Sequence, residues 1–263
     1  MSAADGPLKR ALTAPGPAIG AWIKLEGEDS AEIMARTGFD FLVVDLEHSS
    51  LSGESATRAL RIASLGGRPV LVRTPDLDRV VYQRLLDAGA AAILAPQIES
   101  AAQAHAGASY AAYPPAGVRG FSTTTRAGDW GRVNRDEHLS RAGNEITFVP
   151  QLESEAALTD LDSILAGGGV DAVFIGSADL SVSMGLPQVH EKVQALIAAA
   201  VQACRQRGIL VGTAVGGAAA LTPDHQNFDF VVVGDDGSML AGAARDTLAQ
   251  ARDAMSVSEA GTP

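Results

Sequence analysis

Phe148-Val-Pro-Gln-Leu-Glu153 and, after it, Val173-Phe-Ile-Gly-Ser-Ala-Asp179 decide how this chain folds. Both are apolar runs with a carboxylate at or just past the end, and each is typical of a buried strand. The intervening segment, Ser154 to Leu165, has the spacing of an amphipathic helix. A strand, a helix and a second, parallel strand bring both carboxylates to the same rim of one sheet.

The two carboxylates, Glu153 and Asp179, are candidate metal ligands. They are hard oxygen ligands with no Cys or His beside them, a set that suits Mg2+ or Mn2+ with open positions for water or substrate. A carboxylate after a strand often only caps the following helix, so this alternative stays open for each residue.

Similar apolar runs recur along the whole chain, separated by segments with helical spacing. We expect strands at residues 18–24, 41–45, 69–73, 91–95, 148–152, 171–176, 209–214 and 230–233. Eight strands that alternate with helices predict a closed (β/α)8 barrel, and a doubly wound open sheet is the alternative. The dinucleotide fingerprint GxGxxG does not follow the first strand.

No break in composition divides the chain. We therefore expect one domain over residues 1–263, with short flexible tails at about 1–8 and 256–263 and a last helix from Ser238 to Met255. The segment from Tyr113 to Gly131 is an unusually long irregular stretch, and such stretches are functional or mobile.

The composition excludes several classes of protein. The 263 residues carry a formal net charge of -11, which argues against nucleic-acid and anionic-membrane partners. The single cysteine, Cys204, allows no intrachain disulfide and no thiolate zinc cluster. Because no apolar run approaches about 18 residues and no signal peptide is evident, we expect a cytoplasmic protein.

Polar residues at the carboxyl ends of barrel strands are the candidates for chemistry. His48 is the one histidine in such a position, where it would act as a general acid or base, or alternatively only cap or pack. Arg73 ends the third expected strand and needs an anionic partner, either the substrate or Asp45 or Glu47. Free N–H groups after Gly176 would hold a carboxylate.

Several motifs in order resemble the HpcH/HpaI aldolase family, the class II pyruvate-dependent aldolases. The resemblance runs from Gly20-Ala-Trp to Val231-Val-Val-Gly-Asp235, and it rests on Gly38-Phe-Asp-Phe-Leu-Val-Val-Asp-Leu-Glu-His48, Val72-Arg73, Leu85-Leu-Asp-Ala-Gly89, Tyr113-Pro-Pro-Ala-Gly-Val-Arg-Gly120, Gln151-Leu-Glu153 and Phe174-Ile-Gly-Ser-Ala-Asp-Leu-Ser181.

This resemblance implies a single (β/α)8 TIM barrel of the phosphoenolpyruvate/pyruvate type. It implies a divalent-metal-dependent carbon–carbon lyase that reversibly cleaves a 4-hydroxy-2-oxo acid to pyruvate and an aldehyde through a metal-bound enolate. The cation would be Mg2+ or Mn2+, with Co2+ as a further candidate. Family members are homo-oligomers, hexamers or dimer-based, and many exchange the C-terminal helix, which here begins near Ser238.

Roles for individual residues also follow from the resemblance alone. Glu153 and Asp179 would bind the metal, and Arg73 would contact the keto oxygen and stabilise the enolate. His48 and Asp87 would form a dyad that acts on the aldol hydroxyl through water. Gln151, Ser177 and Ala178 would complete the pyruvate site.

The chain departs from the family where the aldehyde would bind. Ser177 stands where many members have proline, and Ser49 and Ser50 follow His48. One alternative is therefore citrate-synthase-like condensation or decarboxylation of oxaloacetate, with Thr123 to Arg126 as the place for carboxylate-binding groups. A non-catalytic metabolite-binding barrel is a further alternative. Lys24 is the single candidate for covalent Schiff-base chemistry.

Overall fold

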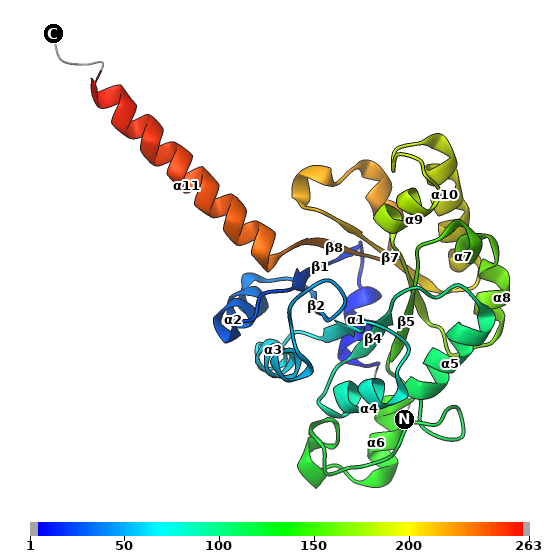
Figure 1. Ribbon diagram of the computed structural model, residues 1–263. Helices are drawn as coiled ribbons and strands as arrows, with labels where there is room; N and C mark the ends of the chain where they lie inside the picture. The colour runs from blue at the N-terminus through cyan, green and yellow to red at the C-terminus, as the bar shows by residue number, and fades with distance from the viewer. Residues whose placement is uncertain (1–4, 260–263) are drawn as a thin grey trace.

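The computed structural model describes residues 5–259 and contains a closed barrel of parallel strands in sequence order, β1 to β8, wrapped by helices (Figure 1). The strands are β1 Ala18–Ile23, β2 Phe41–Asp45, β3 Val70–Arg73, β4 Ala92–Ala95, β5 Phe148–Leu152, β6 Ala172–Ile175, β7 Leu210–Val215 and β8 Phe230–Asp235. The predicted barrel is confirmed, and the alternative of an open sheet is wrong because β1 pairs with β8.

The helices between successive strands cover the outside of the barrel, whereas α1 precedes β1 and α11 follows β8. The helices are α1 Pro7–Leu12, α2 Glu28–Thr37, α3 Gly53–Leu65, α4 Arg79–Asp87, α5 Ala101–Ala111, α6 Arg135–Ala142, α7 Glu155–Thr159, α8 Leu161–Ala166, α9 Ser177–Ser183, α10 Glu191–Gln206 and α11 Asp236–Glu259. The segment from Tyr113 to Gly131 is largely irregular and ends in the 3-10 helix η1 Arg126–Gly131.

Alternation along the strands divides the apolar residues into two cores. Outward residues of the strands pack with the inner faces of the helices, and inward residues such as Trp22, Phe41, Leu71 and Phe174 fill the barrel. Gly20 makes room for the ring of Phe41, which a Cβ at that position would meet. On β1, β2, β3 and β5 the inward positions that follow at the carboxyl ends are polar, namely Lys24, Asp45, Arg73 and Gln151, so the site lies directly above this interior core.

The expected tails differ from the structure at both ends. Residues 1–4 and 260–263 lie outside the described part of the chain. Within the tail expected over 1–8, Pro7 and Leu8 belong to α1, which packs Leu8 and Leu12 with the barrel interior. Within the tail expected from about 256, residues up to Glu259 belong to α11.

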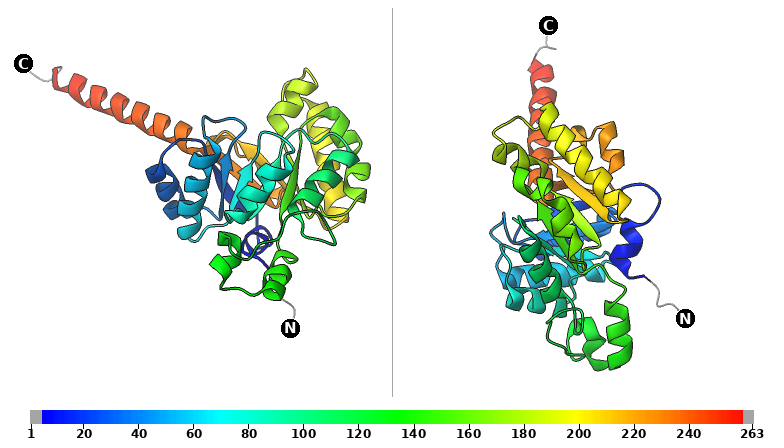
Figure 2. Two further views of the ribbon diagram at one scale, coloured as in Figure 1. Left: turned by 60° about the horizontal axis from the view of Figure 1, so that its bottom comes forward. Right: turned by 90° about the vertical axis from the view of Figure 1, so that its right-hand side faces the viewer.

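Helix α11 leaves the barrel instead of packing on it. Both views in Figure 2 show it projecting away from the strands and from the other helices. Large apolar side chains on it are exposed, namely Met239, Leu240, Leu248 and Met255. Within residues 5–259, no helix has both the length and the apolar character needed to cross a membrane.

Candidate active site

A buried ion-pair network forms the centre of the site at the carboxyl ends of β2 and β3. Asp45 and Arg73 are neighbours in the strand register, and both are almost fully buried. Arg73 donates from Nε to Asp45 Oδ1 at 2.9 Å and from Nη2 to Asp45 Oδ2 at 2.7 Å. Its third nitrogen, Nη1, lies 3.2 Å from Glu47 Oε2. Carboxylates on two sides therefore fix the orientation of the guanidinium plane.

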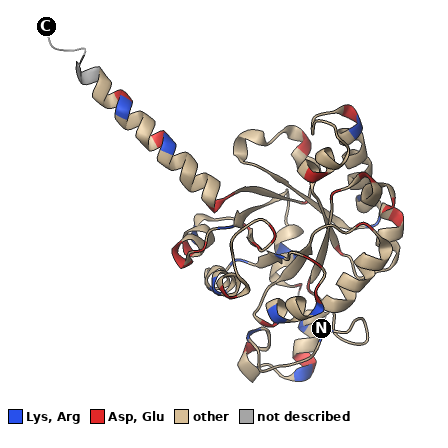
Figure 3. Cartoon of the chain, in the orientation of Figure 1, with Lys and Arg blue, Asp and Glu red and all other residues tan. Residues whose placement is uncertain are grey.

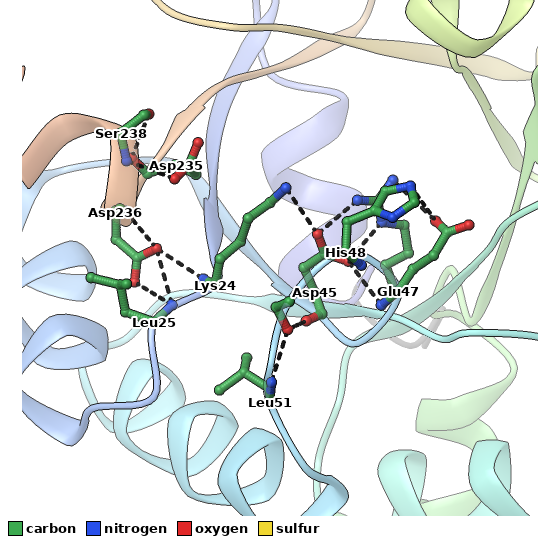
Figure 4. A network of polar contacts seen from close by, with 12 residues as sticks. Lys24, Leu25, Asp45, Glu47, His48, Leu51, Asp235, Asp236 and Ser238 are labelled. Atoms are coloured by element: carbon green, nitrogen blue, oxygen red, sulfur yellow. Dashed lines mark hydrogen bonds and ion pairs between the residues drawn. The ribbon is translucent and has the colours of Figure 1, made fainter. Parts of the chain in front are cut away.

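Asp45 also organises the turn that carries the candidate histidine. Its Oδ1 accepts from the backbone N–H of Glu47 at 3.1 Å and of His48 at 3.2 Å. Burial raises the pKa of Asp45, but hydrogen bonds and charge from Arg73 outweigh it, so the pKa lies below the ordinary value of 3.8. Figure 4 shows Lys24, Asp45, Glu47 and His48 as one connected group.

Trp22 forms the floor beneath this group. The guanidinium of Arg73 lies 4.2 Å from the centroid of its ring, and the ammonium of Lys24 lies 5.8 Å from it. A ring that faces two cations stabilises their positive charge in a largely dry environment. The floor therefore helps to hold the two cations in place.

A second group of polar residues lies at the ends of β4 and β5. Glu153 Oε1 accepts from the backbone N–H of Gln97 at 2.8 Å, and Glu153 Oε2 accepts from the side chain of Gln151. Gln97 has a φ of 55°, a left-handed conformation that is uncommon outside glycine. A Cβ at Gly176 would lie 2.9 Å from Glu153 Oε2, so glycine at this position gives the carboxylate its space.

Asp179, Ser177 and Ala178 all lie in the first turn of α9, directly after β6. The end of β6 is adjacent to Glu153, because Gly176 N donates to Leu152 O at 3.0 Å. Neither candidate metal ligand is a helix cap: Ser154 caps α7, and Gly176 occupies the cap position of α9. The capping alternative is therefore wrong for Glu153 and Asp179.

The residues around Glu153 fit a divalent cation. Within residues 5–259, buried Gln151 Oε1 lacks a hydrogen-bond partner, and the same side chain donates from Nε2 to Glu153 Oε2. Burial is the main cause that raises the pKa of Glu47, and the negative charge of Glu153 adds to it. The carboxylate of Glu153 beside the unpartnered amide oxygen of Gln151 suits a cation with oxygen ligands. No cluster of three or more His, Cys, Asp or Glu side chains with metal-binding geometry occurs in the described chain, so water or substrate would complete the coordination.

His48 stands above the network and faces solvent. Its side chain is 59% exposed, and Nε2 lies 3.9 Å from Glu47 Oε2. The alternative that this histidine is a satisfied core residue is wrong, because a core residue would be enclosed. An exposed imidazole beside a carboxylate is free to exchange a proton with water.

Asp87 lies elsewhere. It ends α4, just before β4, and so belongs to the rim where strands begin, whereas His48 follows the end of β2. In the described chain Asp87 Oδ1 accepts from Arg119 Nη2 at 2.8 Å, and its side chain does not contact His48. One chain by itself therefore does not bring the expected dyad together.

Two parts of the site were open or unassigned in the sequence. Asp45 was one of the possible partners of Arg73, and the structure makes it the hub of the network. Asp236 was not assigned a role. It is buried and accepts from Lys24 N at 2.9 Å and from Ser30 Oγ at 2.6 Å, which joins the start of α11 to the loop after β1 and to α2. The signal for both residues is an acidic side chain at the end of an apolar strand or directly after it.

Comparisons with known proteins identify the family of the chain. The family described as HpcH/HpaI aldolase/citrate lyase matches residues 18–253. A hydroxypyruvate/pyruvate aldolase from Paraburkholderia phytofirmans is 35% identical over 262 residues, which cover 96% of this chain and 100% of the relative. A 4-hydroxy-2-oxo-heptane-1,7-dioate aldolase from Shigella flexneri is 36% identical over 263 residues, with 97% of each chain covered.

A solved structure agrees as well. The crystal structure of an HpcH/HpaI aldolase/citrate lyase family protein from Burkholderia cenocepacia superposes with a TM-score of 0.84 at 30% identity, covering 93% of this chain and 98% of the other. The family match, the aldolase relatives along their full lengths and the shared barrel confirm the resemblance seen in the sequence. The protein belongs to the HpcH/HpaI aldolase/citrate lyase family, a family of carbon–carbon lyases.

Proposed function

We propose that this protein is a divalent-metal-dependent aldolase that reversibly cleaves a 4-hydroxy-2-oxo acid to pyruvate and an aldehyde. The observation that carries the proposal is the orientation of Arg73, which Asp45 and Glu47 hold above Trp22 while Glu153 and the unpartnered Gln151 Oε1 lie at the neighbouring strand ends. Such a pocket fits a small anion that develops charge on its keto oxygen.

Glu153 and Asp179 would hold the cation, Mg2+ or Mn2+, with Co2+ as a further candidate. When bound, the cation would act as a Lewis acid toward the 2-oxo acid. Gln151 and the backbone N–H groups of Ser177 and Ala178 would bind the pyruvate carboxylate. The side-chain oxygen Oε1 of Gln151 is buried without a hydrogen-bond partner in the described chain, and as an acceptor it would face the cation or a water bound to it.

Arg73 would stabilise the charge that develops during cleavage. A base removes the proton of the C4 hydroxyl, the C3–C4 bond breaks, and its electron pair leaves an enolate on the pyruvate fragment while the aldehyde carbonyl forms. The guanidinium places positive charge where the enolate oxygen develops. Because two carboxylates hold the guanidinium in place, it need not reorganise when the charge appears.

His48 would move the proton at the C4 hydroxyl, directly or through water. Its exposure keeps it in contact with solvent, and its Nε2 lies 3.9 Å from Glu47 Oε2. Asp87 belongs to the opposite rim, so it would reach a histidine only on a second copy of the chain. The dyad of His48 and Asp87 would therefore form between two subunits.

The protein would be a homo-oligomer, a hexamer or a dimer-based assembly, and α11 supports this part of the proposal. Helix α11 projects with Leu240 64% exposed, Leu248 52% exposed and Met255 75% exposed. Between Asp236 and Glu259 at its two ends, its charged residues are the adjacent pairs Arg245–Asp246 and Arg252–Asp253 (Figure 3). An exposed apolar helix of this length suits burial against another subunit by exchange. The expected cytoplasmic location stays a prediction.

The test is formation of the pyruvate enolate. The protein is loaded with Mg2+ or Mn2+ and incubated with pyruvate in D2O, and loss of the methyl proton signal is followed with and without EDTA. We expect exchange that EDTA abolishes and added metal restores. Absence of exchange with metal bound would contradict the proposal, and oxaloacetate would then be assayed for decarboxylation.

A further inference from the structure

Lys24 is a cation in the mouth of the barrel, and the proposed cleavage reaction does not use it. It follows the last residue of β1, and its Nζ lies 3.2 Å from Asp45 Oδ2 (Figure 4). Its backbone N–H donates to buried Asp236 at 2.9 Å, which fixes the base of the side chain. The side chain is 28% exposed, so part of it reaches the open mouth.

The ammonium group of Lys24 has N–H donors that are not used within the described chain. An ammonium carries three N–H donors, and Asp45 is the one ion-pair partner of Lys24 Nζ in the described chain. That partner is shared, because Asp45 already accepts both donors of the Arg73 fork. Glu47 faces Arg73 from its other side at 3.2 Å, so the carboxylates balance the two cations, and Lys24 offers a ligand its unused N–H donors.

Lys24 lies across the barrel from the candidate metal ligands. In a closed barrel with strands in the order β1 to β8, β1 lies opposite β5, which ends at Glu153. Arg73 on β3 lies between these two strands along the circumference. A substrate whose 2-oxo acid end lies at Glu153 and Arg73 therefore extends its far end toward β1.

We propose that Lys24 is a specificity-determining residue that binds a carboxylate at the far end of the substrate, on the aldehyde-derived part. This inference rests on the proposed function, and it names the substrate class as 2-oxo acids that carry a second carboxylate. One ammonium matches one carboxylate in charge, and its spare donors supply the hydrogen bonds.

The experiment uses matched pairs of 2-oxo acids that lack the C4 hydroxyl and so cannot be cleaved. The pairs are 2-oxoglutarate with 2-oxopentanoate, 2-oxoadipate with 2-oxohexanoate, and 2-oxopimelate with 2-oxoheptanoate. Within each pair only the terminal carboxylate differs, and the three lengths cover the reach to Lys24. Each compound is tested as a competitive inhibitor of pyruvate deuterium exchange by the metal-loaded protein.

We expect the dicarboxylate to bind about tenfold more tightly than its partner at the best length, the size of one charge-assisted contact. Lys24→Gln should remove this preference, and Lys24→Arg, which keeps the charge, should retain most of it. Lys192→Gln is the matched control, because it removes the same charge from an exposed position at the start of α10.

The outcomes separate the two proposals. Exchange without a preference for dicarboxylates at any length would overturn the role of Lys24 and leave the aldolase proposal intact. The role of Lys24 would also be wrong if Lys24→Gln weakens both members of a pair equally, since Lys24 would then only balance the charge of Asp45. Absence of exchange in the natural protein would refute the aldolase function, and this inference with it.

Discussion

Replacing Asp45 with Asn tests whether the buried ion-pair network holds the site. Asp45 Oδ1 accepts from Arg73 Nε and two backbone N–H groups, whereas Oδ2 faces Arg73 Nη2 at 2.7 Å and Lys24 Nζ at 3.2 Å. Asn keeps an acceptor oxygen in place of Oδ1 and puts an NH2 group in place of Oδ2, where it faces the two cations. Two charged contacts at about 1.5–3 kcal/mol each would be lost, and relaxation leaves a destabilisation of about 3 kcal/mol.

The pH dependence of this effect has a defined sign. The folded-state pKa of Asp45 lies below its ordinary value of 3.8, because Arg73 outweighs the effect of burial. A carboxyl with a depressed pKa contributes stability above its unfolded pKa, and this contribution is lost as the pH falls through the folded pKa. The difference between the natural protein and Asp45→Asn should therefore be constant near neutral pH and shrink in acid, below 3.8.

Urea unfolding and pyruvate exchange check the two consequences. A misplaced guanidinium should slow exchange by about 100-fold, the effect of roughly 1 Å of displacement at a reacting group. Asp40→Asn is the matched control, because Asp40 precedes the same strand and accepts one backbone hydrogen bond from Ile19 at 2.8 Å while exposed. If Asp45→Asn unfolds like this control, or exchanges at the natural rate, the role assigned to the network is wrong.

Four further changes give distinct readouts. Glu153→Gln should abolish metal binding and metal-dependent exchange without unfolding the barrel, as titration with Mn2+ would measure, whereas Glu155→Gln in the exposed start of α7 should change neither. His48→Asn should reduce aldol cleavage by about 10²–10⁴-fold and retain pyruvate exchange, which does not need the C4 hydroxyl; equal loss of both would assign His48 to the enolate step. Burial raises the pKa of Glu145 to about 7, so ionisation of this group lowers the stability of the fold as the pH rises from the ordinary 4.5 through 7. Glu145→Gln should therefore raise the free energy of unfolding by about 1 kcal/mol above that range, after discounting for partial exposure, and should give no gain in acid. Thermal unfolding at both pH extremes would show the difference. Leu248→Asp should shift the oligomer toward smaller species in analytical ultracentrifugation while the barrel stays folded, and an unchanged mass would contradict a buried α11.

Local patterns in the sequence were sufficient to predict the barrel. Each strand is a short apolar run, and each helix has a regular apolar spacing, so the order of elements follows from contacts close in the chain. The strand bounds differ from the expected ones by at most two residues, as at β8, which continues to Asp235. The positions of Glu153 and Asp179 at one rim follow from the same logic, because consecutive parallel strands place their carboxyl ends together.

The beginning of the chain was harder to predict. Residues 7–12 are too few for a periodic pattern, and α1 is stable because Leu8 and Leu12 enter the barrel interior. The extent of α11 was underestimated for the related reason that its Ala-rich end carries no stop signal before Glu259.

Patterns along the chain are therefore enough to predict the alternation of strands and helices, the closed barrel that eight such units form, and the rim that carries the candidate ligands. Which charges meet at that rim depends on the tertiary structure. The β2–β3 register places Asp45 beside Arg73, and Lys24 follows β1, the strand on the other side of β2, and pairs with the same carboxylate. Asp87 lies at the opposite rim and pairs with Arg119. These partners are separated by 21 to 32 residues, a range at which strand register and barrel closure, and not local spacing, set the distance between two side chains.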